Sequence, residues 1–328
     1  MKRREFFQTY GIIIVLIALV AFFSIFTNSF LSVKNMFNIL RQVSIMGIIA
    51  VGMTIVMLTG GIDLSVGSLL AVTGVVGSSL MVSLNWSPLP AIIAAIIAST
   101  IIGTITGLIV EKIDMPPLIT TLGMMTIARG IAFIITNGLP VYGLPESVAI
   151  LGQGYIWVIP IPVIFMLVIF LIGSFILNKT YFGRYFYALG GNEEATRLAG
   201  VNISRIKICI YALSAFLTGI AGVILMSRIN SGQPSAGTGT ELDVVTAVVL
   251  GGVSMSGGEG KLSGVLTGTL IIGVLSNGLI IMNVGEYYQM VVKGLVLILA
   301  VGFDRVSKRN RVKKSKQSKG IAPAVSAK

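Results

Sequence analysis

Long apolar runs separated by short polar segments make up most of the chain. We count ten runs that are long enough, or nearly long enough, to cross a bilayer as an α-helix. They are residues 10–27, 37–58, 66–84, 89–110, 117–136, 156–177, 206–229, 244–255, 262–282 and 287–303. The pattern therefore predicts an all-α, polytopic membrane protein with about ten transmembrane helices, some of them short or broken.

Composition and charge placement support the same class and suggest an orientation. The chain is 55% hydrophobic and 11% charged, with a mean hydropathy of +0.95. A net charge of +12 would suggest nucleic-acid binding in a soluble protein, but most lysines and arginines here lie at the edges of apolar runs, in residues 2–4, 179–207 and 305–319. Basic residues mark the cytoplasmic ends of spans. We therefore expect both termini and the central loop to be cytoplasmic, as an even number of spans requires, and no nucleic-acid partner.

The same pattern sets the expected domain organisation. Residues 1–305 form one transmembrane domain with a cytoplasmic loop at about 178–207, and residues 306–328 form a basic, disordered cytoplasmic tail. The first apolar run lacks a small-residue cleavage pattern at its end, so we interpret it as a retained span. The longest outward loop, residues 137–155, is rich in turn-forming residues and is expected to contain no helix.

A glycine-bearing break separates the second and third apolar runs, and its candidate site residues are Gly60, Gly61, Asp63 and Ser65. Irregular backbone at membrane depth survives only where it is buried in protein or lines water. Two interpretations follow: a gate or pathway element, or a turn in which Asp63 and Ser65 cap the next helix. Residues 257–264 resemble residues 60–67, through either an internal duplication or shared turn chemistry.

Few other residues could carry chemistry. Glu241 and Asp243 precede the short eighth run, where they would cap its N-terminus or face a docking partner outside the cell. Arg129, inside the fifth run, should face protein or water, with an acid as its candidate partner. The chain has no histidine and one cysteine, and we find no metal site, no nucleotide-binding loop and no catalytic set.

A polar, charged island at residues 181–207 interrupts the apolar pattern, and its candidate site residues are Gly190, Gly191, Asn192, Glu193, Glu194, Ala195, Arg197 and Gly200. This segment resembles the EAA-x3-G cytoplasmic coupling segment of ATP-binding-cassette (ABC) importer permeases, with Thr196 in place of the second Ala. Residues 50–71, 241–252 and 287–293 resemble the ribose-type branch of that family. The likeness extends from about residue 30 to residue 303.

The resemblance implies a multi-pass permease of the prokaryotic inner membrane, surrounded by lipid and forming a homodimer. It implies two further partners, an ABC ATPase and an extracytoplasmic sugar-binding protein. The permease itself would not be an enzyme and would bind no cofactor, since ATP and Mg²⁺ would be used by the ATPase. The imported substrate would be a monosaccharide, and ribose or a similar pentose is the leading candidate.

The resemblance also implies roles for the island. A short helix near residues 192–199 would lie in a groove of the ATPase, where Glu193, Glu194 and Arg197 would contact the partner. The glycines at 190, 191 and 200 would set turns at the helix ends.

Two other kinds of transporter compete with this interpretation. An ion-coupled secondary sugar transporter needs carboxylates or other ion ligands near the middle of the membrane. Asp63 is the one well-embedded acid, and it lies towards the end of a span. A passive channel is compatible with the glycine-rich segments but leaves the polar island at residues 181–207 unexplained.

Overall fold

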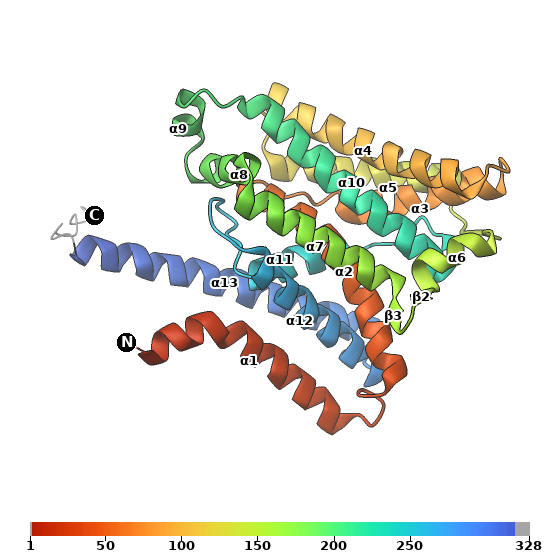
Figure 1. Cartoon of the computed structure of the whole chain (residues 1–328), viewed down its shortest axis with the longest axis horizontal. Helices are drawn as coiled ribbons and strands as arrows, with labels where there is room; N and C mark the ends of the chain where they lie inside the picture. The colour runs from red at the N-terminus through yellow and green to blue at the C-terminus, as the bar shows by residue number, and fades with distance from the viewer. Residues whose placement is uncertain (1, 319–328) are drawn as a thin grey trace.

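The structure, a computed structural model, describes the backbone of residues 2–318 and the side chains of residues 11–302. Most of this part is helical (Figure 1). The helices are α1 (Lys2–Phe26), α2 (Val33–Leu58), α3 (Val66–Val82), α4 (Pro88–Lys112), α5 (Pro117–Thr136), α6 (Glu146–Gln153), α7 (Ile161–Lys179), α8 (Tyr181–Gly191), α9 (Glu193–Leu198), α10 (Ile203–Ile229), α11 (Thr240–Leu250), α12 (Leu262–Ile281) and α13 (Glu286–Ser318). Two short antiparallel pairs join β1 (Val141–Tyr142) to β4 (Ser231–Gly232) and β2 (Tyr155–Ile156) to β3 (Ile159–Pro160).

The predicted α-helical class is confirmed, since the described part is nearly all-α and contains candidate membrane spans. In the described part of the chain, six helices are long and apolar enough to cross a membrane: α2, α4, α5, α7, α10 and α12. Two shorter apolar helices, Gly11–Phe26 within α1 and Val66–Val82, accompany them. The run expected at residues 244–255 forms α11, whose 11 residues are about half the length a bilayer requires.

Helix α2 forms the centre of the molecule. In its apolar stretch 83% of the residues are buried, against 28% in α4 and α5, whose outward faces are apolar. Helices α3, α4, α5 and α10 pack together on one side of α2, and α1, α11, α12 and α13 lie on the other (Figure 1). Small residues permit the closest approach, since a side chain at Gly103 or Gly107 of α4 would collide with the backbone of α10.

The loop expected to contain no helix, residues 137–155, includes α6, so this prediction was wrong. Glycines and prolines on both sides indicate turns, but the segment between them supplies an acidic first turn at Glu146 and a run of apolar residues. Val148 is buried on this helix, and Gly152 lies against the backbone of Arg228 in α10. Tertiary packing therefore stabilises a helix that is too short to form by itself.

The last helix also differs from the expected disordered tail. Helix α13 begins at Glu286 and continues to Ser318, so the backbone of residues 306–318 is helical. Lysine, arginine and glutamine are good helix formers, and extending an existing helix needs no new nucleus. Residues 319–328, and the side chains of the basic residues at 2–4 and after 303, lie outside what the structure describes. The beginning of α1 and the end of α13 lie at the same end of the molecule as α9 (Figure 1).

Candidate functional site

The polar island folds into two short helices, α8 and α9, that meet at Asn192. The Asn192 side chain caps α9 by accepting a hydrogen bond from the backbone N–H of Ala195 at 2.9 Å. Thr196 donates to the Asn192 carbonyl at 2.8 Å, and Gly200, with a φ of +82°, follows the helix. The short helix that the resemblance implies near residues 192–199 is therefore present, with Gly200 just after its end.

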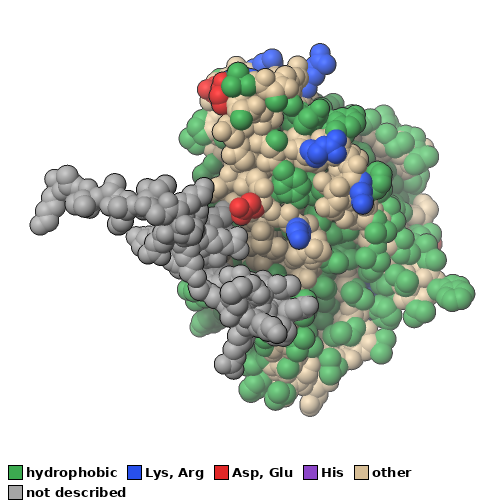
Figure 2. Space-filling model, turned by 60° about the vertical axis from the view of Figure 1, so that its left-hand side comes forward, with side chains coloured by type: hydrophobic (Ala, Val, Ile, Leu, Met, Phe, Trp, Pro, Cys, Tyr) green, Lys and Arg blue, Asp and Glu red, His purple; other side chains and the backbone are tan. Residues whose placement is uncertain are grey.

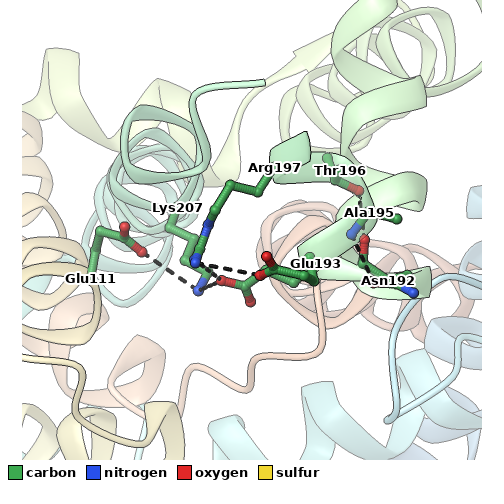
Figure 3. A network of polar contacts seen from close by, with 8 residues as sticks. Glu111, Asn192, Glu193, Ala195, Thr196, Arg197 and Lys207 are labelled. Atoms are coloured by element: carbon green, nitrogen blue, oxygen red, sulfur yellow. Dashed lines mark hydrogen bonds and ion pairs between the residues drawn. The ribbon is translucent and has the colours of Figure 1, made fainter. Parts of the chain in front are cut away.

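An ion-pair network attaches α9 to the ends of α4 and α10 (Figure 3). The Lys207 ammonium lies 2.8 Å from a Glu193 carboxylate oxygen and 3.5 Å from one of Glu111. Arg197 lies 3.3 Å from the same Glu193 oxygen and 3.5 Å from Glu194. Glu193 thus contacts two cations and its side chain is 42% exposed, whereas the Glu194 side chain is 68% exposed. Charged side chains gather on this end of the molecule, and hydrophobic ones cover its flanks (Figure 2).

Replacing Lys207 by methionine should loosen α9. Two carboxylates, Glu111 and Glu193, would lose the cation between them, at a cost of about 1 kcal/mol for this partly exposed site. Backbone amides of residues 192–202 should then exchange hydrogen faster in mass-spectrometric exchange experiments. Lys179→Met, at the end of α7 and outside the ion pairs of residues 11–302, is the control. Equal exchange in wild type and Lys207→Met would contradict this role.

The C-terminal end of α8 is inserted at the meeting point of two glycine loops. One loop is the break after α2, at Gly60, and the other connects α11 to α12. The backbone N–H of Gly258 donates to the Leu58 carbonyl at 2.8 Å, which joins the two loops. A side-chain carbon at Gly190 would overlap that carbonyl oxygen and lie 2.5 Å from the Gly258 nitrogen. We call this contact of Gly60, Gly190, Gly257 and Gly258 the glycine junction.

Two of these glycines are required for different reasons. Gly257 has a φ of +81°, and a side-chain carbon there would lie 2.9 Å from both Gly190 Cα and Gly60 N. Gly190 and Gly191, expected to set turns at helix ends, are the last two residues of α8, and Gly190 permits the close approach of α8 to both loops. The two similar segments, residues 60–67 and 257–264, thus meet at their first glycines.

A tyrosine strengthens the contact between α8 and the second glycine loop. The Tyr187 hydroxyl donates to the Gly260 carbonyl at 2.9 Å. Partial burial raises the pKa of this phenol above its usual value, so it stays protonated and remains a donor at neutral pH.

Asp63 is fully enclosed by protein, with 1% of its surface exposed. One carboxylate oxygen accepts from the Ser65 backbone N–H at 3.1 Å and from the Ser65 hydroxyl at 2.5 Å. The other accepts from the Ser214 hydroxyl of α10 at 3.0 Å. Ser65 occupies the N-cap position of α3 without a side-chain cap hydrogen bond. The capping expected of this serine is therefore absent, and Asp63 organises the turn.

The remaining candidates lie around α11. Glu241 accepts from the Gly239 backbone N–H at 3.2 Å at the start of this helix, as the capping interpretation expects. Asp243 instead pairs with Lys293 of α13 at 2.6 Å. Arg129 faces protein, as expected, but donates to the carbonyls of Pro234 and Ala236 at 2.8 and 2.6 Å. Within residues 11–302, no group of three histidine, cysteine or acidic side chains could hold a metal ion.

Sequence reasoning missed several residues that complete these contacts. They are Glu111, Lys207, Ser214, Lys293 and Tyr187. Their spacing along the chain gives no signal of the pairing, because each partner comes from a distant helix or loop.

Comparison with known proteins identifies the family. The family described as "Branched-chain amino acid transport system / permease component" matches residues 35–301. The chain belongs to this family. No solved structure matches the permease.

Curated relatives of the permease are sugar transport proteins. It is 48% identical to the ribose import permease protein RbsC of Escherichia coli (strain K12), over 89% of this chain and 92% of the relative. It is 49% identical to RbsC of Bacillus subtilis (strain 168), over 91% and 93%. The L-arabinose transport system permease protein AraH of Escherichia coli (strain K12) is 42% identical, over 92% and 91%. The permease is the membrane subunit of an ABC importer, without catalysis of its own, and it works with an ATPase and a substrate-binding protein.

Proposed function

We propose that this permease imports a monosaccharide, with ribose or a similar pentose as the leading candidate. The observation that carries the proposal is near 50% identity to two ribose import permeases over about nine tenths of the chain, above the 42% to the arabinose relative. Cation-driven transport would need ion ligands near the middle of the membrane. In this structure the Asp63 oxygens are already engaged by serine donors.

The proposal includes an orientation in the prokaryotic inner membrane. We propose about ten spans, a homodimer in lipid, and a cytoplasmic position for α9 and both termini. Support comes from the common end of the molecule where α9, the start of α1 and the end of α13 lie, and from the basic residues of these segments. The apolar outward faces of α4, α5 and α7 suit lipid.

Coupling to the ATPase is proposed to occur through α8 and α9. Glu194 and Arg197 are the most exposed charged residues of α9 and would contact the ATPase, which binds ATP and Mg²⁺ while this chain binds neither. When the ATPase moves α8, the glycine junction would transmit this movement to the loops that follow α2 and α11. A partner that binds one of two states more tightly shifts the equilibrium between them.

Reconstituted transport tests the function directly. Proteoliposomes with the permease, its ATPase and its sugar-binding protein should accumulate labelled ribose only with ATP and Mg²⁺ on the ATPase side. Ionophores that collapse ion gradients should not reduce uptake. Uptake lost with the gradients would indicate a secondary transporter, and ATP-independent equilibration a passive channel.

Glu194→Lys should weaken association with the ATPase. The substitution reverses the charge of an exposed α9 side chain and removes its ion pair with Arg197, but it leaves both contacts of Lys207 in place, so insertion into the membrane should be normal. Co-purification in mild detergent measures the loss, expected at about fivefold for a charge reversal in an interface. Glu146→Lys on α6, at the opposite end, is the matched control. Unchanged association and transport would disprove the proposed contact.

A further inference from the structure

Two arginines lie close together at the end of the molecule opposite α9, where α2, α6 and α10 meet (Figure 1). Arg41 of α2 donates to the Gln153 carbonyl at 2.9 Å. The Gln153 side chain donates to the carbonyls of Ser227 and Arg228 at 3.3 and 3.1 Å. Arg228 in turn donates to the Asn38 side chain, one turn before Arg41, at 2.8 Å. Gln153, the last residue of α6, thus contacts the guanidinium group of Arg41 and the backbone of Arg228.

This pair carries two positive charges without a negative partner. The two positively charged guanidinium groups are close enough to repel each other. Neither takes part in an ion pair among residues 11–302. The Nε of Arg41 is buried without a hydrogen-bond partner. A guanidinium has five N–H donors, and the bonds above use one nitrogen of each arginine. Two adjacent cations with unused donors favour an anion that accepts from both.

The surroundings of the pair indicate that this anion comes from the membrane. The Tyr155 ring lies under Arg41, 4.7 Å from its guanidinium carbon, and meets Phe37 edge-on. Tyr155 begins the β2–β3 hairpin, whose tip residue Trp157 is 97% exposed between the exposed Ile156 and Val158. Exposed aromatic and apolar residues at span ends are typical of the lipid interface. The hairpin leads directly into α7, whose outward side chains are apolar.

We propose that Arg41 and Arg228 bind the phosphate of an anionic phospholipid. The two guanidinium groups neutralise the headgroup, Tyr155 and Trp157 lie at headgroup level, and the acyl chains follow the outward face of α7. Phosphate suits the site because its oxygens accept from two planar guanidinium forks at once. The bound lipid would tie α2, α6 and α10 together at this end.

Native mass spectrometry of the full-length permease tests this site. Added phosphatidylglycerol should remain bound at higher occupancy than phosphatidylcholine, whose headgroup is zwitterionic. The double variant Arg41→Gln/Arg228→Gln should bind phosphatidylglycerol about tenfold more weakly, since it loses both charge-assisted contacts. Arg184→Gln/Arg205→Gln removes the same charge at the α9 end and should bind like wild type. Equal binding by wild type and the Arg41/Arg228 variant would overturn the proposal.

A second measurement needs no variant and covers the case in which the double variant does not fold. A photoactivatable phosphatidylglycerol, crosslinked to wild-type permease in native membranes, should label residues 153–158. Labelling spread evenly over the apolar helices would overturn the proposal.

Two further outcomes would assign the site to another ligand. Displacement of phosphatidylglycerol by glycerol phosphate would assign the site to a soluble phosphate. Loss of sugar-binding-protein association in Arg41→Gln/Arg228→Gln, with lipid binding unchanged, would assign it to protein docking.

Discussion

Gly190→Ala is expected to uncouple ATP hydrolysis from transport. The added methyl group would overlap the Leu58 carbonyl oxygen and lie 2.5 Å from the Gly258 nitrogen. Both obstacles are backbone atoms, so no rotamer change relieves the collision. Helix α8 must move away from the glycine junction, and the hydrogen bond from Gly258 to Leu58 is exposed or lost. Sugar transported per ATP hydrolysed should fall about tenfold, within the range of coupling energies of 1–3 kcal/mol.

The neighbouring glycine provides a matched control. A side-chain carbon at Gly191 would meet no atom within 4 Å, so Gly191→Ala adds the same methyl group to the same helix without a collision. Its ratio of transport to ATP hydrolysis, measured in proteoliposomes with the ATPase and binding protein, should equal that of wild type. Co-purification with the ATPase should be normal for both variants. An unchanged ratio in Gly190→Ala, or an equal loss in both, would contradict transmission through the junction.

Much of the site's local structure was predictable because local chemistry determines it. Asn192 followed by Glu193 and Glu194 is a helix start, and the asparagine caps α9 as this pattern predicts. Gly200 takes the left-handed conformation after the helix. The break at Gly60 follows from two adjacent glycines in an apolar run. Each of these features depends on residues fewer than ten positions apart.

The contacts between distant segments were not predictable. Glu193 and Arg197, one helical turn apart, form the pair that spacing suggests, yet Glu193 also binds Lys207, which approaches Glu111 of another helix. From the sequence, Gly190 was interpreted as a turn residue, because no neighbouring residue indicates that Leu58 and Gly258 lie against it. The α6 helix was missed for the same reason, because its packing against α10 comes from residues far along the chain.

Asp63→Ala is expected to destabilise the permease strongly. Three donors, the backbone N–H and hydroxyl of Ser65 and the hydroxyl of Ser214, would lose their acceptor in a site sealed from water. Each buried polar group left unpaired costs about 1–3 kcal/mol, and the two hydroxyls can recover part of this with nearby carbonyls, so we expect a loss of about 3 kcal/mol. Thermal unfolding of the purified chain in detergent measures the fall in melting temperature. A melting temperature equal to that of wild type would contradict the structural role of Asp63.

Asp63→Asn separates this structural role from contact with the sugar. An asparagine keeps one oxygen to accept from Ser65, and its amide can donate to the Ser214 hydroxyl, which can rotate to accept. If Asp63 only organises the turn before α3, Asp63→Asn should keep most of the stability and most of the ribose uptake. Near-normal stability with uptake reduced about tenfold would instead show that the carboxylate acts on the transport pathway, in a conformation that exposes it. Since protein donors occupy both carboxylate oxygens, we expect the first outcome.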